Sequence, residues 1–191
     1  MRNTNVFNST RLHKWLFLFL VISSMILSAC GTSPSSDGVT GVWVGSIEGT
    51  ETFIGIASNG SEVMVYVCDG NTLSQWFHGQ TGEENVDLSA GTLDLSSEGS
   101  NVQAQLTVDS ASGKVTLAND ETFTFQAARA AGDAGLYRLE ETGNDEQWVS
   151  GWVVLNDGQL RGLRVSTKGT VEVLGALNSA ALRLDPDMRT Y

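Results

Sequence analysis

The chain has few of the residue types on which catalytic and metal sites most often depend. Its 191 residues include two cysteines and two histidines, and no lysine or arginine occurs between Cys30 and Lys114. Asp and Glu outnumber Lys and Arg by 22 to 11, which gives a formal net charge of −11. Because such a chain repels phosphate backbones and anionic head groups, we do not expect nucleic acid among its partners. The charge favours a soluble, repulsive surface, and the alternative is a docking face for a cationic partner.

Residues 1–29 have the layout of a secretory signal. Arg2, Arg11 and Lys14 precede an apolar run from Trp15 to Leu27. This run, roughly 13 to 15 residues long, is shorter than the ~20 needed to span a bilayer as a helix. The alternative is a membrane helix that is never cleaved.

The segment Leu27-Ser28-Ala29-Cys30 resembles the lipobox of bacterial lipoproteins. In that family the cysteine receives a diacylglyceryl group, and its amine is acylated after cleavage. The resemblance implies that lipid on Cys30 attaches the protein to the cell membrane or the outer membrane, outside the cytoplasm. We therefore expect a signal peptide over 1–29, a lipidated cysteine with a flexible tether over 30–38, and one domain over 39–191.

If Cys30 carries lipid, Cys68 has no partner for a disulfide, and only Cys68 and His78 remain as soft ligands. This is too few for a usual zinc site. The oxygen-rich segments 69–71 and 143–146 lack the spacing of an EF-hand calcium loop. We therefore expect neither a metal nor a cofactor.

Cys68 and His78 are also the only candidates for a nucleophilic catalytic pair. However, Cys68 ends an apolar segment, and Asp69 follows it. Burial and a neighbouring negative charge both raise the pKa of a thiol, which favours a structural role for Cys68. We expect no catalytic residues.

Alternating apolar and polar residues predict strands through most of the domain, as in Val102, Ala104, Leu106 and Val108. The expected fold is an all-β domain, a single antiparallel barrel or sandwich of roughly nine to eleven short strands with short helical turns. We expect strands near 41–47, 52–58, 62–68, 84–88, 91–95, 101–108, 114–118, 121–127, 135–140, 147–155 and 159–166, with a further one at 170–174. Residues 52–58 and 62–68 are apolar on both faces, so these two strands should lie centrally.

Three local patterns give further expectations. Asn59-Gly60 favours a type I′ hairpin turn. Leu73, Trp76 and Phe77 have the spacing of one face of a helical turn, which Asn71 can cap. The same spacing in Leu177, Ala181 and Leu184 predicts a helix before Pro186.

Aromatic residues are the best candidates for ligand contact. Trp148 and Trp152 share one face of a predicted strand, and they could hold an apolar ligand if that face lines a barrel. Tyr66 and Trp76 are the other two candidate ligand-binding residues. The alternative for all four is that they fill the core.

Two further segments resemble known groups. Residues 38–43 and 49–53 are similar to the start of avidin-type barrels, and Gly41-x-Trp43 is similar to lipocalins. Where avidins carry a ligand-binding Asn, this chain has Gly45, so the resemblance implies a barrel and not biotin binding. Residues 66–70, 76–79, 134–138 and 151–158 resemble a pattern in uncharacterised exported domains of bacteria, which implies a shared fold.

These observations favour a non-enzymatic binding or scaffold module of the cell envelope. The alternatives are a carrier of a small apolar ligand in a barrel and an envelope hydrolase. A carrier should have a cavity walled by Trp148 or Trp152, whereas a scaffold should have a filled core. Its partners would be the membrane, through lipid on Cys30, and a protein or small apolar ligand.

Overall fold

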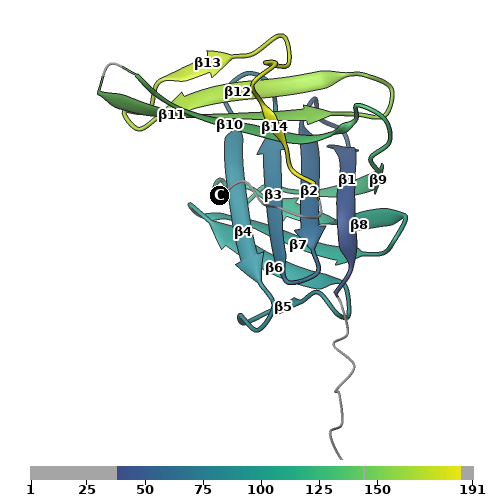
Figure 1. The fold of residues 1–191 in the computed structure, drawn as a ribbon. Coiled ribbons are helices and arrows are strands. Elements are labelled where there is room, and N and C mark those ends of the chain that lie inside the picture. The colour runs from purple at the N-terminus through teal and green to yellow at the C-terminus, as the bar shows by residue number, and fades with distance from the viewer. Residues whose placement is uncertain (1–37, 144, 186–191) are drawn as a thin grey trace, which may run out of the picture. The chain divides into compact units, whose positions relative to one another are not determined.

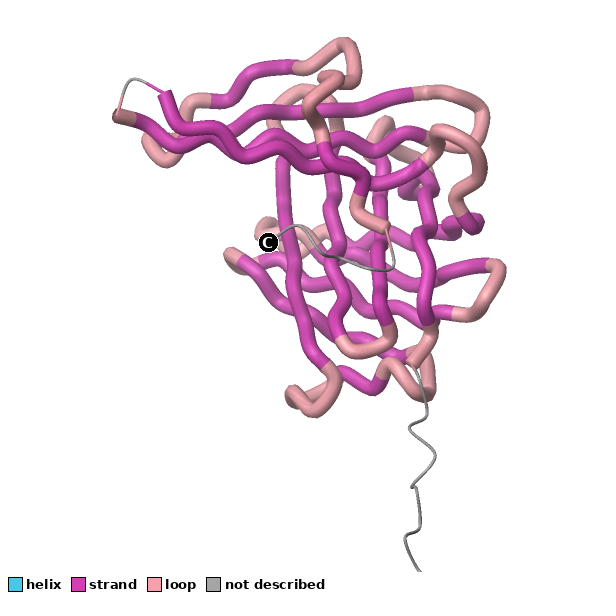
Figure 2. The backbone as a smooth tube through the Cα atoms, in the orientation of Figure 1, coloured by secondary structure: helices cyan, strands magenta, loops and turns pink. Residues whose placement is uncertain are grey.

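The computed structural model of the chain describes residues 38–143 and 145–185, which form fourteen strands and no helix (Figures 1 and 2). The all-β prediction is confirmed. The predicted signal peptide, Cys30 and the tether up to residue 37 lie outside the described residues. Within the described part of the chain, no helix is long and apolar enough to cross a membrane.

Nine strands form one antiparallel sheet in the order β4-β3-β2-β1-β9-β8-β7-β6-β5. The first four strands of the chain join the other five where β1 pairs with β9. Since β4, at one edge of the sheet, lies beside β6, the sheet curls into a nearly closed barrel. The strands are β1 (Thr40–Ile47), β2 (Phe53–Asn59), β3 (Glu62–Cys68), β4 (Ser74–Gln80), β5 (Val86–Asp87), β6 (Thr92–Ser97), β7 (Ser100–Leu106), β8 (Ser110–Thr116) and β9 (Thr122–Arg129).

The remaining five strands form a second sheet in the order β13-β12-β11-β10-β14. It packs on the outer face of β1–β4, and Figure 1 shows its strands running across them at a steep angle. The strands are β10 (Gly135–Gly143), β11 (Glu146–Val154), β12 (Leu160–Ser166), β13 (Val171–Val173) and β14 (Leu182–Arg183).

The alternation of side chains explains why the central strands are apolar on both faces. In β3, Val63, Val65 and Val67 point into the barrel core. Its other residues, Met64, Tyr66 and Cys68, point into the core between the two sheets. The prediction that the second and third strands lie centrally is therefore confirmed, and the second sheet is what covers their outer face.

Glycines allow the sharp curvature of the barrel sheet. A Cβ atom at Gly113 would lie 1.9 Å from the carbonyl oxygen of Gln103 on the neighbouring strand. A Cβ at Gly45 would lie 2.1 Å from the carbonyl oxygen of Gln126. Side chains at these two positions would force neighbouring strands apart.

Both helix predictions are wrong. Residues 74–80 form β4, because Phe77 can enter the barrel core while Trp76 stacks on Tyr66 on the opposite face. Near the C-terminus, Leu184 enters the core between the sheets, Ala181 packs on the outer side of the second sheet, and Leu177 is exposed. Since these three residues contact different surroundings, a helix with one common apolar face does not form.

The hairpin at Asn59-Gly60 is present, but the predicted turn type is wrong. β2 ends at Asn59 and β3 begins at Glu62, so the central residues are Gly60 and Ser61. Only Gly60 has a positive φ, of 86°, whereas a type I′ turn requires positive φ at both central residues. The Asn59 side chain instead accepts hydrogen bonds from the backbone N–H groups of Ser61 and Glu62. These two bonds satisfy backbone donors of the turn.

Candidate functional site

A cleft of about 400 Å³ lies between the second sheet and one edge of the barrel. We call it the β4 cleft. One wall comes from β10, β11 and β12, and the other from the start of β4 and the turn between β6 and β7. Its lining residues are Ser74, Gln75, Trp76, Ser97, Glu98, Arg138, Gln147, Val149, Val165, Ser166 and Thr167.

The wall from the second sheet contains an apolar row among polar residues. Val149 of β11 lies opposite Val165 of β12, which in turn lies opposite Val171 of β13. The three side chains therefore form one row across three strands. Val149 and Val165 are half-buried, and Val171 is exposed at the sheet edge, so the row offers apolar contact area to a ligand.

The opposite wall is centred on an ordered aromatic pair. The rings of Tyr66 and Trp76 stack with centroids 4.2 Å apart. The Arg138 guanidinium lies 4.7 Å from the centroid of the Trp76 ring, and it also pairs with Glu140 at 2.5 Å. These contacts hold the half-buried Trp76 in place at the cleft.

Polar side chains at the cleft are held by bonds across the barrel edge. The Gln75 Nε2 donates to Ser97 Oγ at 2.9 Å, which joins β4 to the end of β6. The hydroxyls of Tyr66 and Ser74 lie 3.0 Å apart in a second hydrogen bond. The cleft therefore combines a row of valines, one aromatic edge and a few fixed polar groups, as small-ligand and peptide sites commonly do.

Ionisable groups beneath the cleft are kept neutral. Burial raises the pKa of the Tyr66 phenol far above its usual value, and the nearby Cys68 adds to the rise. Burial likewise raises the pKa of the Cys68 thiol, although hydrogen bonds with Tyr66 and with the Gly70 N–H oppose the shift. The expectation of a buried thiol with raised pKa is confirmed, and the thiolate is scarce at neutral pH.

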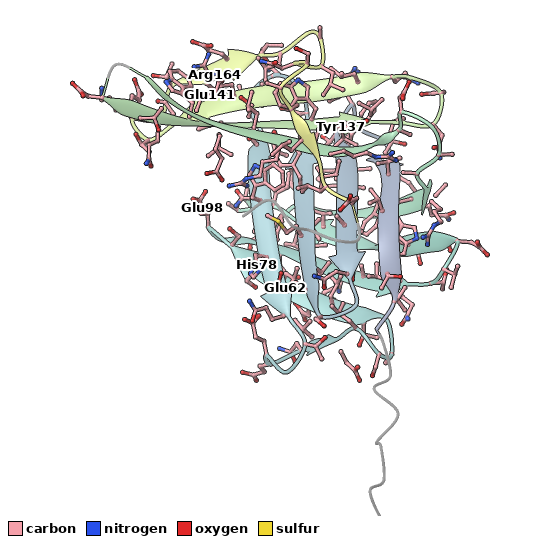
Figure 3. The ribbon with its side chains drawn as sticks, in the orientation of Figure 1. Glu62, His78, Glu98, Tyr137, Glu141 and Arg164 are labelled. Carbon is pink, nitrogen blue, oxygen red and sulfur yellow. The ribbon has the colours of Figure 1, made fainter. Side chains whose placement is uncertain are left out.

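The structure does not bring Cys68 and His78 together. Along the β3–β4 pair, Cys68 lies opposite Ser74, whereas His78 lies opposite Met64. His78 is thus four residues away along the ladder, or about 13 Å. The His78 side chain is exposed, and Figure 3 labels it on the lower half of β4, while Cys68 is buried. These positions do not form a catalytic pair.

Trp148 and Trp152 do share one face of a strand, but the strand belongs to the second sheet and not to the barrel. Their face points away from the barrel, on the side where Figure 3 labels Arg164. Trp152 is 1 % exposed, and its Nε1 donates to the carbonyl oxygen of Ala176 at 3.0 Å. Trp148 is half-buried under the Arg164 guanidinium, which lies 4.1 Å from its ring centroid. Neither tryptophan lines the barrel interior or the β4 cleft.

A broader hollow of about 810 Å³ lies on the outer side of β6–β9. Its side chains are mostly polar, and Asp94 accepts a hydrogen bond from Gln103, which also lines the hollow. None of the described residues that line it is aromatic. Because the β4 cleft has walls from two sheets and apolar as well as polar groups, it is the better candidate for a binding site.

Two of the four candidate ligand-binding residues, Tyr66 and Trp76, are at or beneath the β4 cleft. Sequence reasoning missed Val149, Val165 and Glu98. The valines lie in segments that were predicted as strands, but their alignment depends on the pairing register. Scans against protein-family models, curated proteins and solved structures found no match to this chain.

Proposed function

We propose that the chain is a lipid-anchored protein of the bacterial cell envelope whose β domain is a non-enzymatic binding module. The β4 cleft is its binding site, and a segment of a partner protein is its ligand. The observation that carries this proposal is the cleft itself, where Val149, Val165 and Trp76 converge with fixed polar groups between two sheets.

The packing of the barrel supports a binding module over a carrier. Large side chains fill the barrel interior, among them Trp43, Ile54, Phe77 and Phe125, which are at most 2 % exposed. An apolar ligand would have to displace this close-packed core. The separation of Cys68 from His78 similarly supports a binding module over a hydrolase.

Blocking the cleft should prevent partner binding. We expect a photocrosslinking amino acid in place of the exposed Thr167 to capture a discrete partner in intact cells. Val165→Trp fills the cleft and should abolish this adduct. Val108→Trp, at a residue that is 66 % exposed and distant in sequence, is the matched control and should leave the adduct unchanged. Equal adduct yields in all three proteins would contradict the assignment of the cleft.

The membrane anchor has a separate test. Cys30→Ala should abolish the incorporation of a labelled fatty acid, because the thiol of Cys30 is the proposed attachment site. Cys68→Ala is the matched control and should incorporate the label as wild type does, since Cys68 is buried in the folded domain. Labelling of the Cys30→Ala protein at the wild-type level would refute the anchor.

A further inference from the structure

The barrel sheet has an edge strand with free backbone groups at the β4 cleft. β4 is the first strand in the sheet order and pairs only with β3. At the two ends of the β3–β4 ladder, Asp69 N–H donates to Leu73 O and Thr81 N–H donates to Ser61 O. In an antiparallel pair of strands, every second pair of opposite residues is hydrogen-bonded. Counting from these two ends, the backbone N–H and C=O groups of Gln75, Phe77 and Gly79 are the ones that point toward β3.

The backbone groups of Ser74, Trp76 and His78 therefore point to the other side of β4. Within residues 38–143 and 145–185, no backbone group bonds to them. On that side the nearest strand is β6, which forms no ladder with β4. Near the start of β4, the Gln75 side chain reaches Ser97 at the end of β6 through a hydrogen bond. Ser74 and Trp76 are also lining residues of the cleft, so its wall includes an unpaired strand edge.

The charged residues that line the cleft are one acid, Glu98, and one base, Arg138. The Glu98 side chain is exposed in the β6–β7 turn, and Figure 3 shows it beside β4, below the second sheet. No described residue bonds to or pairs with its carboxylate. No lysine or arginine occurs between Gly38 and Gly113, and Arg138 on the opposite wall pairs with Glu140. A ligand that reaches Glu98 is therefore favoured if it carries a positive charge.

The turn geometry holds Glu98 at this place. Glu98 and Gly99 have φ values of 49° and 82°, which are the positive values of a two-residue type I′ turn. Asn, Asp or Gly is the usual first residue of such a turn, and glutamate is unfavourable there. Turn chemistry thus does not account for glutamate at this position.

We propose that the β4 cleft binds an extended basic peptide segment, which adds as a strand to the free edge of β4. This inference rests on the proposed function and specifies its ligand. The peptide backbone bonds to Ser74 and Trp76, in the manner of strand addition at an exposed sheet edge. Because successive side chains of a strand point to opposite faces, one set contacts Val149 and Val165 while the other set faces Ser97 and Glu98. The ligand therefore has alternating apolar and basic residues.

The test uses a fluorescein-labelled peptide of sequence Lys-Val-Lys-Val-Lys-Val, capped at both ends, and fluorescence anisotropy with the folded domain. We expect saturable binding, and we expect none with the matched peptide in which Glu replaces Lys. Two N-methylated forms, one methylated at the lysines and one at the valines, each remove the N–H groups of one edge. One form should lose at least about tenfold in affinity and the other little, because only one edge bonds to β4.

Charge variants of the protein test the role of Glu98. Glu98→Lys should weaken the Lys-Val peptide by about fivefold or more. The matched control is Glu84→Lys, an equal charge change at an exposed residue in the β4–β5 connection, and it should have little effect. The inference would be overturned if both protein variants lost equal affinity for the peptide, or if both methylated peptides bound equally. It would also be overturned if no binding occurred at about 1 mM peptide. The crosslinking from position 167 does not depend on this peptide, so the proposed function can stand if strand addition fails.

Discussion

Trp43→Ala should cause the largest loss of stability among single substitutions in the barrel, about 3–5 kcal/mol of unfolding free energy. Trp43 is 0 % exposed and belongs to the barrel core together with residues from β2, β3, β4 and β9. Its removal leaves a cavity in a close-packed interior that cannot fully collapse. The measurement is urea denaturation of the domain, in which the midpoint should fall without a change in slope.

The indole N–H of Trp43 provides a sharper comparison. No described residue accepts a hydrogen bond from Trp43 Nε1, although this atom is buried. Trp152 is equally buried, but its Nε1 donates to the carbonyl oxygen of Ala176 at 3.0 Å. Trp43→Phe therefore loses no hydrogen bond, whereas Trp152→Phe leaves an acceptor without its donor. We expect Trp152→Phe to cost about 1 kcal/mol more than Trp43→Phe, and the reverse order would contradict the bonding seen at these two residues.

Most strand positions could be predicted because local patterns determine them. The third strand was predicted at 62–68, the bounds that β3 has, since apolar residues occupy both faces and turn residues flank it. The half-buried strands β7 and β9 were recognisable from alternation, with Asn101, Gln103 and Gln105 on the outer side of β7. Fourteen strands are more than the nine to eleven predicted, in part because β4 and β14 lie in segments for which helical structure was predicted.

β4 was mistaken for a helical turn for a physical reason. Apolar residues at positions 73, 76 and 77 satisfy a helical spacing, but in a strand Trp76 and Phe77 point to opposite faces. That arrangement is stable only when both faces of the strand meet apolar surroundings. The second sheet supplies one of them, and its docking is a tertiary contact that periodicity along the segment does not contain.

The β4 cleft could be predicted only in part for the same reason. Tyr66 and Trp76 were candidates as aromatic residues, but their stacking follows from their being opposite each other in the β3–β4 ladder. Val149 and Val165 share the cleft because the pairing of β11 with β12 places them opposite each other. Both facts depend on register, and the relative placement of the two sheets then creates the hollow between them.

Gly151→Ala should disrupt this placement of the second sheet on the barrel. A Cβ atom at Gly151 would lie 2.6 Å from Cζ of Tyr66 and 2.7 Å from Cζ2 of Trp76. Those ring atoms are held by stacking and by the Tyr66–Ser74 hydrogen bond, so they cannot move aside easily. We expect a loss of about 1–3 kcal/mol of unfolding free energy.

The matched control is Gly143→Ala, at the end of β10 in the same sheet. Apart from its chain neighbours, no described residue has a heavy atom within 4 Å of a Cβ at Gly143, so this change should be neutral or slightly stabilising. Native-state hydrogen exchange locates the effect. In Gly151→Ala, exchange should accelerate in β10–β12 more than in β6–β8, because the second sheet loses its close contact with Tyr66 and Trp76 while the barrel core remains packed. Uniform acceleration throughout the domain would instead mean that the two sheets unfold as one unit, and an unchanged rate would mean that the aromatic pair tolerates the added methyl group.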